Sequence, residues 1–368
     1  MNINIAKADI VQGVNIVQKA VSTKSPLLML QSILLKAENG KLLFAGTDLE
    51  IGIKYSIAAD IIEEGSILVP ARLFSEIVRR VPDEIIKIET SGQSATIKYT
   101  NSSFTINGYD PEEYPEIGGF NTATSLNIPG LAFKNIVRQT AFACKTDDEK
   151  GSVFSGILAE VNDDILTMVG TDTHRLALSS GNIPATEEHT SWIVPSKAMQ
   201  EVSRLLQNED ILTIEGASNA SRLIFKFNDI EIITRLIEGK YPNHKQVIPT
   251  SCNTKIYFDR LALLESVERV ALLSRDTYLK TSIVRFNIEA EQIVINQTSE
   301  MGKIVENIPI ELEGKELALS FNVRYVIDAL KNIETEKALM ETSGPFNPCV
   351  FRPENDDKYL CLVLPLRY

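Results

Sequence analysis

A three-residue motif that occurs twice constrains the fold of this chain more than any other feature. Gly46-Thr47-Asp48 follows an apolar run, and Gly170-Thr171-Asp172 follows a second run of the same kind. The two glycines are 124 residues apart, about a third of the 368-residue chain. Self-similarity at a fixed long period is the signature of duplicated structural units. The motif therefore predicts a chain built from copies of one fold.

Two further landmarks repeat with nearly the same period. Val69-Pro70 returns as Val194-Pro195 after 125 residues, and Tyr114-Pro115 returns as Tyr241-Pro242 after 127 residues. The last third of the chain is more diverged but keeps the same order of segments. Coincidental spacing is a poor explanation for three landmarks that agree this closely. The sequence predicts three domains, at residues 1–124, 125–249 and 250–368.

Apolar residues spaced three and four apart predict two helices in each third of the chain. Short runs of β-branched and aromatic residues between turn residues predict about eight strands in each third. The expected fold class is α+β, with two helices packed on antiparallel sheets in each of three domains. The expected helices cover residues 10–21, 71–81, 131–144, 197–206, 260–273 and 323–333.

Composition excludes several classes of protein. With 44% hydrophobic and 23% charged residues, the chain has an ordinary globular composition. The N-terminus lacks the pattern of a signal peptide, and no apolar run approaches the roughly 18 residues of a membrane span. The four cysteines are far apart, with no CxxC pair and no adjacent histidine, which favours free thiols in a cytoplasmic protein. They are Cys144, Cys252, Cys349 and Cys361. No metal site and no cofactor are expected.

The positive charge is concentrated on the expected helices. With their flanks, these six segments carry a formal charge of +9, which leaves −21 for the rest of a chain whose net charge is −12. Basic helices without interleaved aromatic residues suit the phosphate backbone of DNA, the sequence-independent component of binding. No recognition helix, zinc finger or RNP motif indicates base reading. Contacts that are weak individually would need a topological device, such as a ring, to persist.

Several motifs together resemble the bacterial DNA polymerase III beta subunit family, the sliding clamps. The resemblance covers the whole chain. It implies a head-to-tail homodimer in which each chain of three clamp domains forms a half ring. The ring would encircle duplex DNA, with helices lining the hole, and tether the replicative polymerase, the clamp loader and repair proteins. The motifs are Gly46–Glu50, Thr171–Ala177, Gly239–Pro242, Val247–Pro249, Phe321–Tyr325 and Leu364–Arg367.

The resemblance also implies two sets of contact residues. At the dimer interface, Phe104 and Ile106 on an edge strand would meet Leu272 and Leu273 of the other chain. A heterologous contact of this kind closes into a ring or propagates as a fibre. Against DNA, Lys24 and Arg72 fall on family positions, Lys197 follows by symmetry with Arg72, and the loop Thr146–Val153 takes the place of a DNA-contacting loop. The residues of that loop assigned to DNA are Lys150, Ser152 and Val153.

The resemblance further implies a pocket for short linear peptides of partner proteins. Pro365 cannot continue a strand, so Leu364–Tyr368 are expected to leave the sheet with exposed apolar side chains. Thr173 stands where the family usually has glycine, and Gln246 where a basic residue is common. The expected lining residues are Phe154, Thr171, His174, Arg175, Leu176, Pro242, Val247, Tyr278, Asn322, Tyr325, Phe346, Leu362, Val363, Leu364, Pro365, Leu366 and Arg367.

Two other functions compete with this hypothesis. Asp172 and His174 would lie on one face of an extended strand, as an acid–base pair or two metal ligands. Because Asp48 recurs at the equivalent position of the first repeat, an aspartate that forms the turn is the better account. The chain is therefore not expected to be an enzyme. A peptide-docking scaffold that never meets DNA would share the pocket but leaves the basic helices unexplained.

Overall fold

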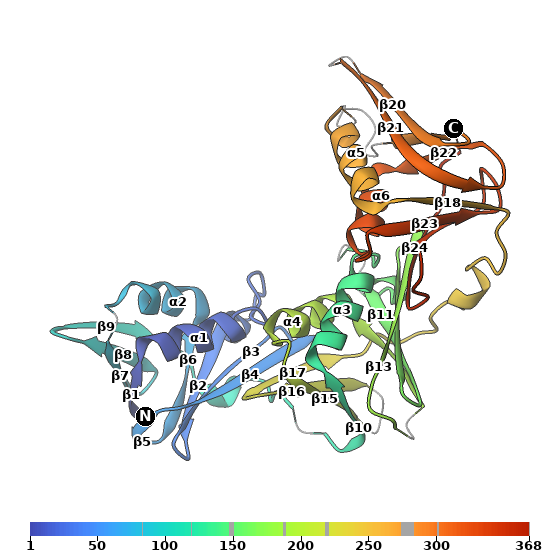
Figure 1. Cartoon of the computed structure of the whole chain (residues 1–368). Coiled ribbons are helices and arrows are strands. Elements are labelled where there is room, and N and C mark those ends of the chain that lie inside the picture. Colours follow the sequence, from blue (N-terminus) through green and yellow to red (C-terminus); the bar gives the residue numbers. More distant parts are fainter. Residues whose placement is uncertain are drawn as a thin grey trace. The chain divides into compact units, whose positions relative to one another are not determined.

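The computed structural model describes residues 1–82, 84–118, 120–146, 151–186, 189–217, 221–273, 283–299 and 302–367. Six α-helices lie within these ranges, and they confirm the helices predicted from apolar spacing (Figure 1). The helices are α1 (Lys7–Val17), α2 (Ala71–Arg80), α3 (Gly130–Ala141), α4 (Ser196–Leu205), α5 (Arg260–Leu273) and α6 (Val323–Lys331).

The strands form three sheets in which every pairing is antiparallel. The five-stranded sheet has the order β5 (Asp60–Glu63), β1 (Asn2–Ala6), β7 (Ile85–Ser91), β8 (Ser94–Tyr99) and β9 (Ser102–Asn107). The eight-stranded sheet has the order β10 (Thr122–Pro129), β15 (Ile211–Ala217), β16 (Arg222–Phe227), β17 (Ile230–Arg235), β4 (Ile51–Ala58), β3 (Lys41–Thr47), β2 (Ser32–Glu38) and β6 (Gly65–Pro70). The twelve-stranded sheet has the order β14 (Thr190–Pro195), β11 (Gly156–Asn162), β12 (Ile165–Thr171), β13 (Arg175–Asn182), β25 (Tyr359–Val363), β24 (Cys349–Pro353), β23 (Lys337–Thr342), β18 (Thr254–Asp259), β21 (Gly302–Glu313), β20 (Gln292–Ser299), β19 (Ile283–Ile288) and β22 (Leu317–Asn322).

The chain divides into two compact units, which cut across the repeats. Unit 1 comprises Met1–Leu131 and Lys197–Leu236, and unit 2 comprises Ala132–Ser196 and Ile237–Tyr368. The middle of the chain is shared because β17 pairs with β4 inside unit 1, whereas β13 pairs with β25 inside unit 2. Each unit thus contains one strand-paired junction between repeats. Within each unit the helices lie on one side of the sheets (Figure 1).

The repeated glycine allows the first helix of a repeat to pack closely on a strand of the same repeat. A Cβ on Gly46 would lie 2.6 Å from the carbonyl oxygen of Val17 at the end of α1. A Cβ on Gly170 would lie 2.4 Å from the carbonyl oxygen of Thr140 at the end of α3. Real Cβ atoms do not approach backbone this closely, so only glycine fits either position. The motif is repeated because the same helix–strand contact is repeated.

The last strand ends where the sequence predicts. β25 ends at Val363, and Leu364 is 37% exposed. This confirms that the segment from Leu364 onward, which we call the tail, leaves the sheet. All four cysteines are free, and three of them, including Cys144, are buried. Burial raises the pKa of each of those three thiols to about 12, so they stay protonated at neutral pH. No helix in the described ranges is both long and apolar enough to cross a membrane.

Candidate functional site

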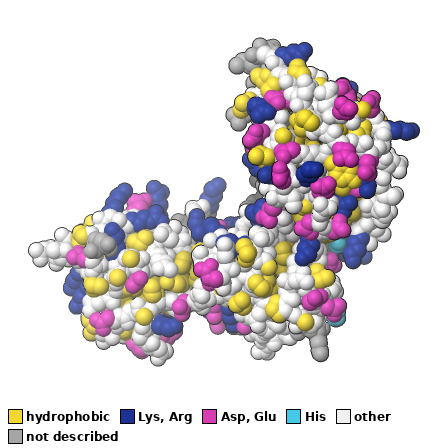
Figure 2. All heavy atoms as spheres, in the orientation of Figure 1, with side chains coloured by type: hydrophobic (Ala, Val, Ile, Leu, Met, Phe, Trp, Pro, Cys, Tyr) yellow, Lys and Arg dark blue, Asp and Glu magenta, His cyan; other side chains and the backbone are white. Residues whose placement is uncertain are grey.

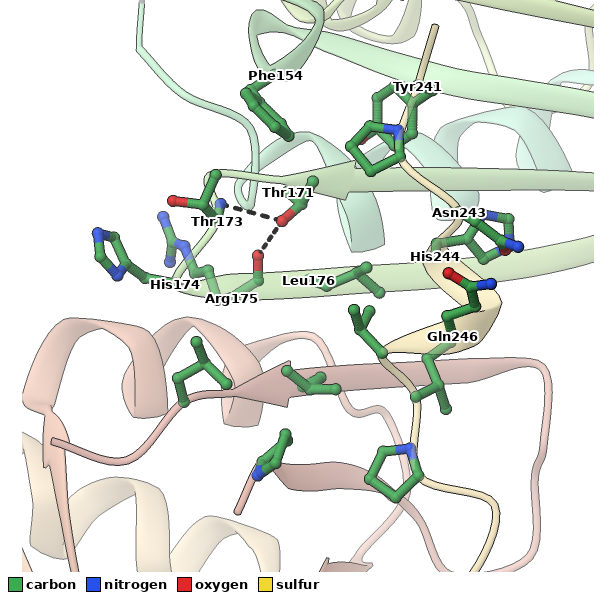
Figure 3. A pocket seen from close by; sticks show the side chains of 17 residues that line it. Phe154, Thr171, Thr173, His174, Arg175, Leu176, Tyr241, Asn243, His244 and Gln246 are labelled. Carbon is green, nitrogen blue, oxygen red and sulfur yellow. Dashed lines mark hydrogen bonds between the residues drawn. The ribbon is translucent and has the colours of Figure 1, made fainter. Parts of the chain in front are cut away.

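A pocket of about 570 Å³ lies within unit 2, a volume typical of small-ligand and peptide sites. Three segments supply all of its lining residues except Phe154 and Pro348: the turn between β12 and β13 with its flanks, the segment 241–249, and the end of β25 with Leu364. We call the segment 241–249 the strap. Most lining side chains are aliphatic or aromatic (Figure 3). The lining residues are Phe154, Thr171, Thr173, His174, Arg175, Leu176, Tyr241, Pro242, Asn243, His244, Gln246, Val247, Ile248, Pro249, Pro348, Leu362 and Leu364.

Side-chain hydrogen bonds build the turn that forms one wall of the pocket. Thr171 Oγ1 donates to the carbonyl of Arg175 at 2.6 Å and accepts from the N–H of Thr173 at 3.2 Å (dashed in Figure 3). Asp172 Oδ1 accepts from the N–H groups of His174 and Arg175 at 2.9 and 3.0 Å. Asp48 makes the corresponding bonds in unit 1. The aspartate therefore forms the turn, as the sequence predicts, and is not poised to accept a proton from His174.

Thr173 adopts a left-handed backbone conformation, with φ at 79°. A β-branched residue is strained there, whereas glycine adopts this conformation without strain. Leu49, its counterpart in unit 1, has φ at 77°. Threonine in place of the expected glycine at position 173 therefore strains the backbone but leaves the path of the turn unchanged.

Replacing Thr173 with glycine is expected to stabilise unit 2 by about 0.5–1 kcal/mol. Relief of the left-handed strain outweighs the extra flexibility that glycine gives the unfolded chain. Urea unfolding monitored by circular dichroism measures the change. Leu49→Gly is the matched control, with a smaller gain expected because leucine is not β-branched. A lower stability for Thr173→Gly would show that the threonine side chain makes a compensating contact.

The strap closes the pocket from the other side. The hydroxyl of Tyr241 donates to the carbonyl of Val169 at 3.1 Å, which fixes the strap to β12. His244 is 6% exposed and has its Nε2 3.9 Å from a carboxylate oxygen of Glu160. Burial lowers the pKa of His244, and Glu160 opposes this shift only in part, so the imidazole is neutral at pH 7. Gln246 adds an uncharged amide. The strap therefore offers neutral hydrogen-bonding groups beside an apolar surface.

The structure brings nine of the expected pocket residues together. These are Phe154, Thr171, His174, Arg175, Leu176, Pro242, Val247, Leu362 and Leu364. Sequence reasoning missed Tyr241, Asn243, His244, Ile248, Pro249 and Pro348, although the repeated Tyr-Pro pair marks the start of the strap. Tyr278 lies outside the described residues.

Seven other expected residues lie elsewhere in unit 2. Val363 is fully buried, because it faces the core side of β25. Asn322 caps α6 by accepting from the N–H of Arg324. Arg367 stacks over the ring of Phe346 at 6.0 Å, and the N–H of Leu366 donates to the carbonyl of Ser320. The ring of Tyr325 stacks on the guanidinium of Arg175. Pro365 lies between Leu364 and Leu366, after the end of β25.

Arg175 does not present its charge to the pocket, contrary to the expectation that it orients a ligand. Its side chain is 11% exposed. Its guanidinium donates to Asp172, to Asp328 and to the carbonyl of Phe142, so what faces the pocket is its aliphatic stem. His174, in contrast, is exposed.

The expected DNA-contact residues lie in both units. In unit 1, Lys24 is exposed, and Arg72 on α2 is 95% exposed and pairs with Glu76. Lys197, at the start of α4, is half exposed and lies 3.7 Å from Asp48. Figure 2 shows Lys and Arg side chains gathered along the helix side of unit 1.

The assigned loop residues in unit 2 have local structural roles. Ser152 caps a short 3-10 helix, and Val153 packs against the core beside the pocket. Neither is an open cationic contact. Lys150 lies outside the described residues.

Among the sheet edges in the described part of the chain, two carry or adjoin the expected interface residues, namely β9 and the first part of β21. β9 is the last strand of the five-stranded sheet. In β21, residues 302–309 pair with β20, and residues 310–313 pair with β18, so the first part is bound on one side. Phe104 on β9 is 46% exposed and Val305 on β21 is 48% exposed. Edges of this kind are templates for pairing with another chain.

The expected interface residues differ in exposure. Leu272, near the end of α5, is 66% exposed, and α5 packs against β21. Leu273 is half-buried. Ile106 is 5% exposed because its side chain packs within its own repeat. It was expected to contact a partner, but of the pair on β9 only Phe104 offers surface.

Comparison with known proteins covers the full length of the chain. Three family models of the DNA polymerase III beta subunit match this chain. The model of the N-terminal domain matches residues 1–118, that of the central domain residues 127–243, and that of the C-terminal domain residues 245–367. The beta sliding clamp of Halalkalibacterium halodurans is 34% identical over 373 residues, which is 97% of each chain. The crystal structure of the Bacillus subtilis clamp has a TM-score of 0.95 at 31% identity and covers 100% of this chain and 99% of its own. A Pseudomonas aeruginosa clamp bound to griselimycin has a TM-score of 0.93 at 26% identity and covers 100% of each.

Proposed function

The chain belongs to the DNA polymerase III beta subunit family and is a DNA sliding clamp, and from this premise we propose how it works. Two copies join head to tail into a ring that encloses duplex DNA. Each copy tethers the replicative polymerase and other proteins by their short peptides. The clamp acts in the cytoplasm and catalyses no reaction. Its three domains follow the repeats, at 1–124, 125–249 and 250–368.

The strongest support for the dimer comes from two strand pairings inside the chain, which provide a pattern that a contact between two chains could repeat. β17 pairs with β4 in unit 1, and β25 pairs with β13 in unit 2. β9 corresponds to β17 and β25, because each follows its neighbour through a hairpin at the end of a repeat. β21 corresponds to β4 and β13, because each of these strands forms an antiparallel pair with the strand just before it in its repeat. This correspondence supports assigning the edge of β9 and the free part of β21 as the two halves of a third junction, formed between two chains.

The burial of the third residue in each corresponding strand supports the same assignment. Ile232 of β17 and Cys361 of β25 are fully buried at the junctions inside the chain. Phe104 is the third residue of β9 and is 46% exposed. Pairing with β21 of a second copy would bury it as its counterparts are buried. Because the two free edges differ, the contact is heterologous, and two copies that each use both edges close a ring.

DNA binding rests on the arrangement of charge. In each unit the helices share one side of the sheets, so the share of the total +9 that each unit carries lies on that side. The rest of the chain carries −21 and repels phosphate from the other surfaces. Lys24, Arg72 and Lys197 supply exposed or half-exposed cations on this side of unit 1. The expected contact is with the backbone of DNA, without base reading.

Peptide binding rests on the pocket. Leu176, Val247 and Leu362 offer an apolar surface for the leucine- or phenylalanine-like anchors of a linear peptide. The amides of Asn243 and Gln246 and the imidazole of His174 are the polar groups that orient it. A recognition site of this composition favours uncharged apolar peptides.

Sedimentation equilibrium of the full chain tests the proposed assembly. A chain of 40.9 kDa that pairs through both free edges is expected to have twice that mass at micromolar concentration. A mass of 40.9 kDa under these conditions would contradict the closed dimer. A mass that keeps rising with concentration would indicate an open filament instead.

A further inference from the structure

Arg175 connects two parts of unit 2 that belong to different repeats. Its Nε donates to Asp172 at 3.1 Å, and another nitrogen donates to the carbonyl of Phe142 at 2.6 Å. On the far side, its guanidinium donates to Asp328 of α6 at 2.5 Å and stacks on Tyr325 of α6 at 4.4 Å. The Arg175 side chain is 11% exposed and Asp172 12%, so this pair is screened little by salt, whereas Asp328 is 38% exposed. The pocket turn and α6 are thus fixed to each other through one side chain.

Arg138 makes a second, more exposed connection between the same two repeats, with its side chain 41% and that of Glu334 61% exposed. From α3, it donates to the side chain of Asn332 at 3.3 Å and to the carboxylate of Glu334, both just after α6. Beside it, Gln139 donates to the carbonyl of Asn332 at 3.2 Å. Two arginines of the central domain therefore contact the body of α6 and the residues just after it.

The corresponding junction in unit 1 has neither connection. The residue three positions after the motif aspartate is Arg175 in unit 2 but Ile51 in unit 1, where it is 4% exposed. The ninth residue of the first helix is Arg138 in α3 but Asn15 in α1. Counted from the first residue of each helix, Leu205 at the end of α4 and Gln207 just after it correspond to Asn332 and Glu334 after α6.

The neutral counterparts leave space in unit 1. Asn15, Leu205 and Gln207 line a cleft of about 800 Å³ between α1 and the end of α4. The fold of a junction therefore forms without the two arginines. Their presence at the junction that carries the peptide pocket needs a separate reason.

We propose that Arg175 and Arg138 are positioning residues that keep the peptide pocket in its binding shape. This inference rests on the proposed peptide-binding function. The mechanical link runs from α6 through Asn322 to β22, where the carbonyl of Ser320 accepts from the N–H of Leu366 at 2.7 Å. The tail is bound at its other end by Leu364, whose N–H donates to the carbonyl of His174 at 3.0 Å. Fixing α6 to the turn thus fixes both ends of the tail at the rim of the pocket, so that a peptide meets a site already ordered.

The test compares peptide affinity in Arg175→Met, Asp328→Asn and wild type by isothermal titration calorimetry. The probe is a blocked pentapeptide, acetyl-Ser-Leu-Ser-Leu-Phe-amide. Methionine keeps an aliphatic stem against the pocket and removes every N–H donor, so a tenfold or greater loss of affinity is expected. Asp328→Asn removes the negative charge that faces the guanidinium with little change of shape, and a threefold to tenfold loss is expected. If Arg175→Met does not fold, the affinity of Asp328→Asn still tests the proposal.

Hydrogen exchange separates positioning from loss of stability. In both variants the amides of Leu364 and Leu366 are expected to exchange at least tenfold faster, while those of β13 and β25 stay protected. The control is Ile51→Val in unit 1, which removes a buried methylene at the corresponding position and should leave affinity and tail exchange unchanged.

The outcomes are distinct. Failure of the wild-type chain to bind the probe would overturn the proposed peptide site itself. Binding by wild type and by both variants with equal affinity would overturn the positioning role alone. Equal loss of affinity in Ile51→Val would also overturn it, because the effect would then be one of general stability.

Discussion

Replacing Phe104 with lysine is expected to convert the protein from a dimer into monomers at micromolar concentration. The substitution removes a large aromatic contact and places an ammonium group where the pairing with β21 excludes water. Together these effects cost about 4 kcal/mol or more, which raises the dissociation constant about a thousandfold. Sedimentation velocity measures the result. The single chain should still fold, because Phe104 is already 46% exposed within it.

A control on the same sheet isolates the interface. Ile62 on β5, the opposite edge strand, is 57% exposed, and Ile62→Lys should leave the dimer intact. Leu272→Lys on α5 tests the other partner surface and should also give monomers, since Leu272 is 66% exposed beside β21. The half-buried Leu273 should give a similar result but with some loss of stability. A stable dimer of the Phe104 variant would contradict the assignment of β9 to the interface.

Deleting residues 364–368 is expected to weaken peptide binding at least a hundredfold. The deletion removes Leu364 from the wall of the pocket, together with the hydrogen bonds that the tail makes to His174 and Ser320. Loss of a central apolar anchor typically costs about 2–4 kcal/mol in an interface. Calorimetric titration with the blocked pentapeptide measures it. Sedimentation should still show a dimer, because neither β9 nor β21 is touched.

A point substitution guards against wider effects of the deletion. Leu364→Asp keeps the backbone bonds of the tail and places a charge in the apolar pocket, so it should lower affinity by a similar factor. Arg367→Ala removes only the stacking contact with Phe346 outside the pocket and should change affinity little. Unchanged affinity in the deletion variant would place peptide binding elsewhere on the chain.

Local chemistry explains why much of the fold could be predicted from sequence. The Gly-Thr-Asp turns form from side chains that bond backbone groups two to four residues away, so the turn is encoded in five consecutive residues. The helices were predictable because their apolar residues follow a 3.6-residue period. The exposed tail followed from Pro365, which lacks the N–H that a sheet requires.

Contacts between distant segments explain what could not be predicted. Arg175 pairs with Val363 across β13 and β25, and nothing near either residue encodes this partner. The direction of the Arg175 guanidinium depends on Asp328, which is 153 residues away. The burial of Ile106 and the contribution of His244 to the pocket could not be predicted either, because both depend on contacts with distant segments. Alternation along a strand shows which residues share a face, but not which face is covered.

The measurement that tests enclosure of DNA most directly is retention on circular and linear duplexes. The clamp is loaded onto nicked circular DNA with a clamp loader, separated from free protein at high salt, and followed after a restriction enzyme linearises the circle. A ring that encloses DNA without gripping bases should stay on the circle through the salt wash and leave within minutes of linearisation. Equal, salt-dependent loss from circular and linear DNA would show a surface binder and contradict enclosure.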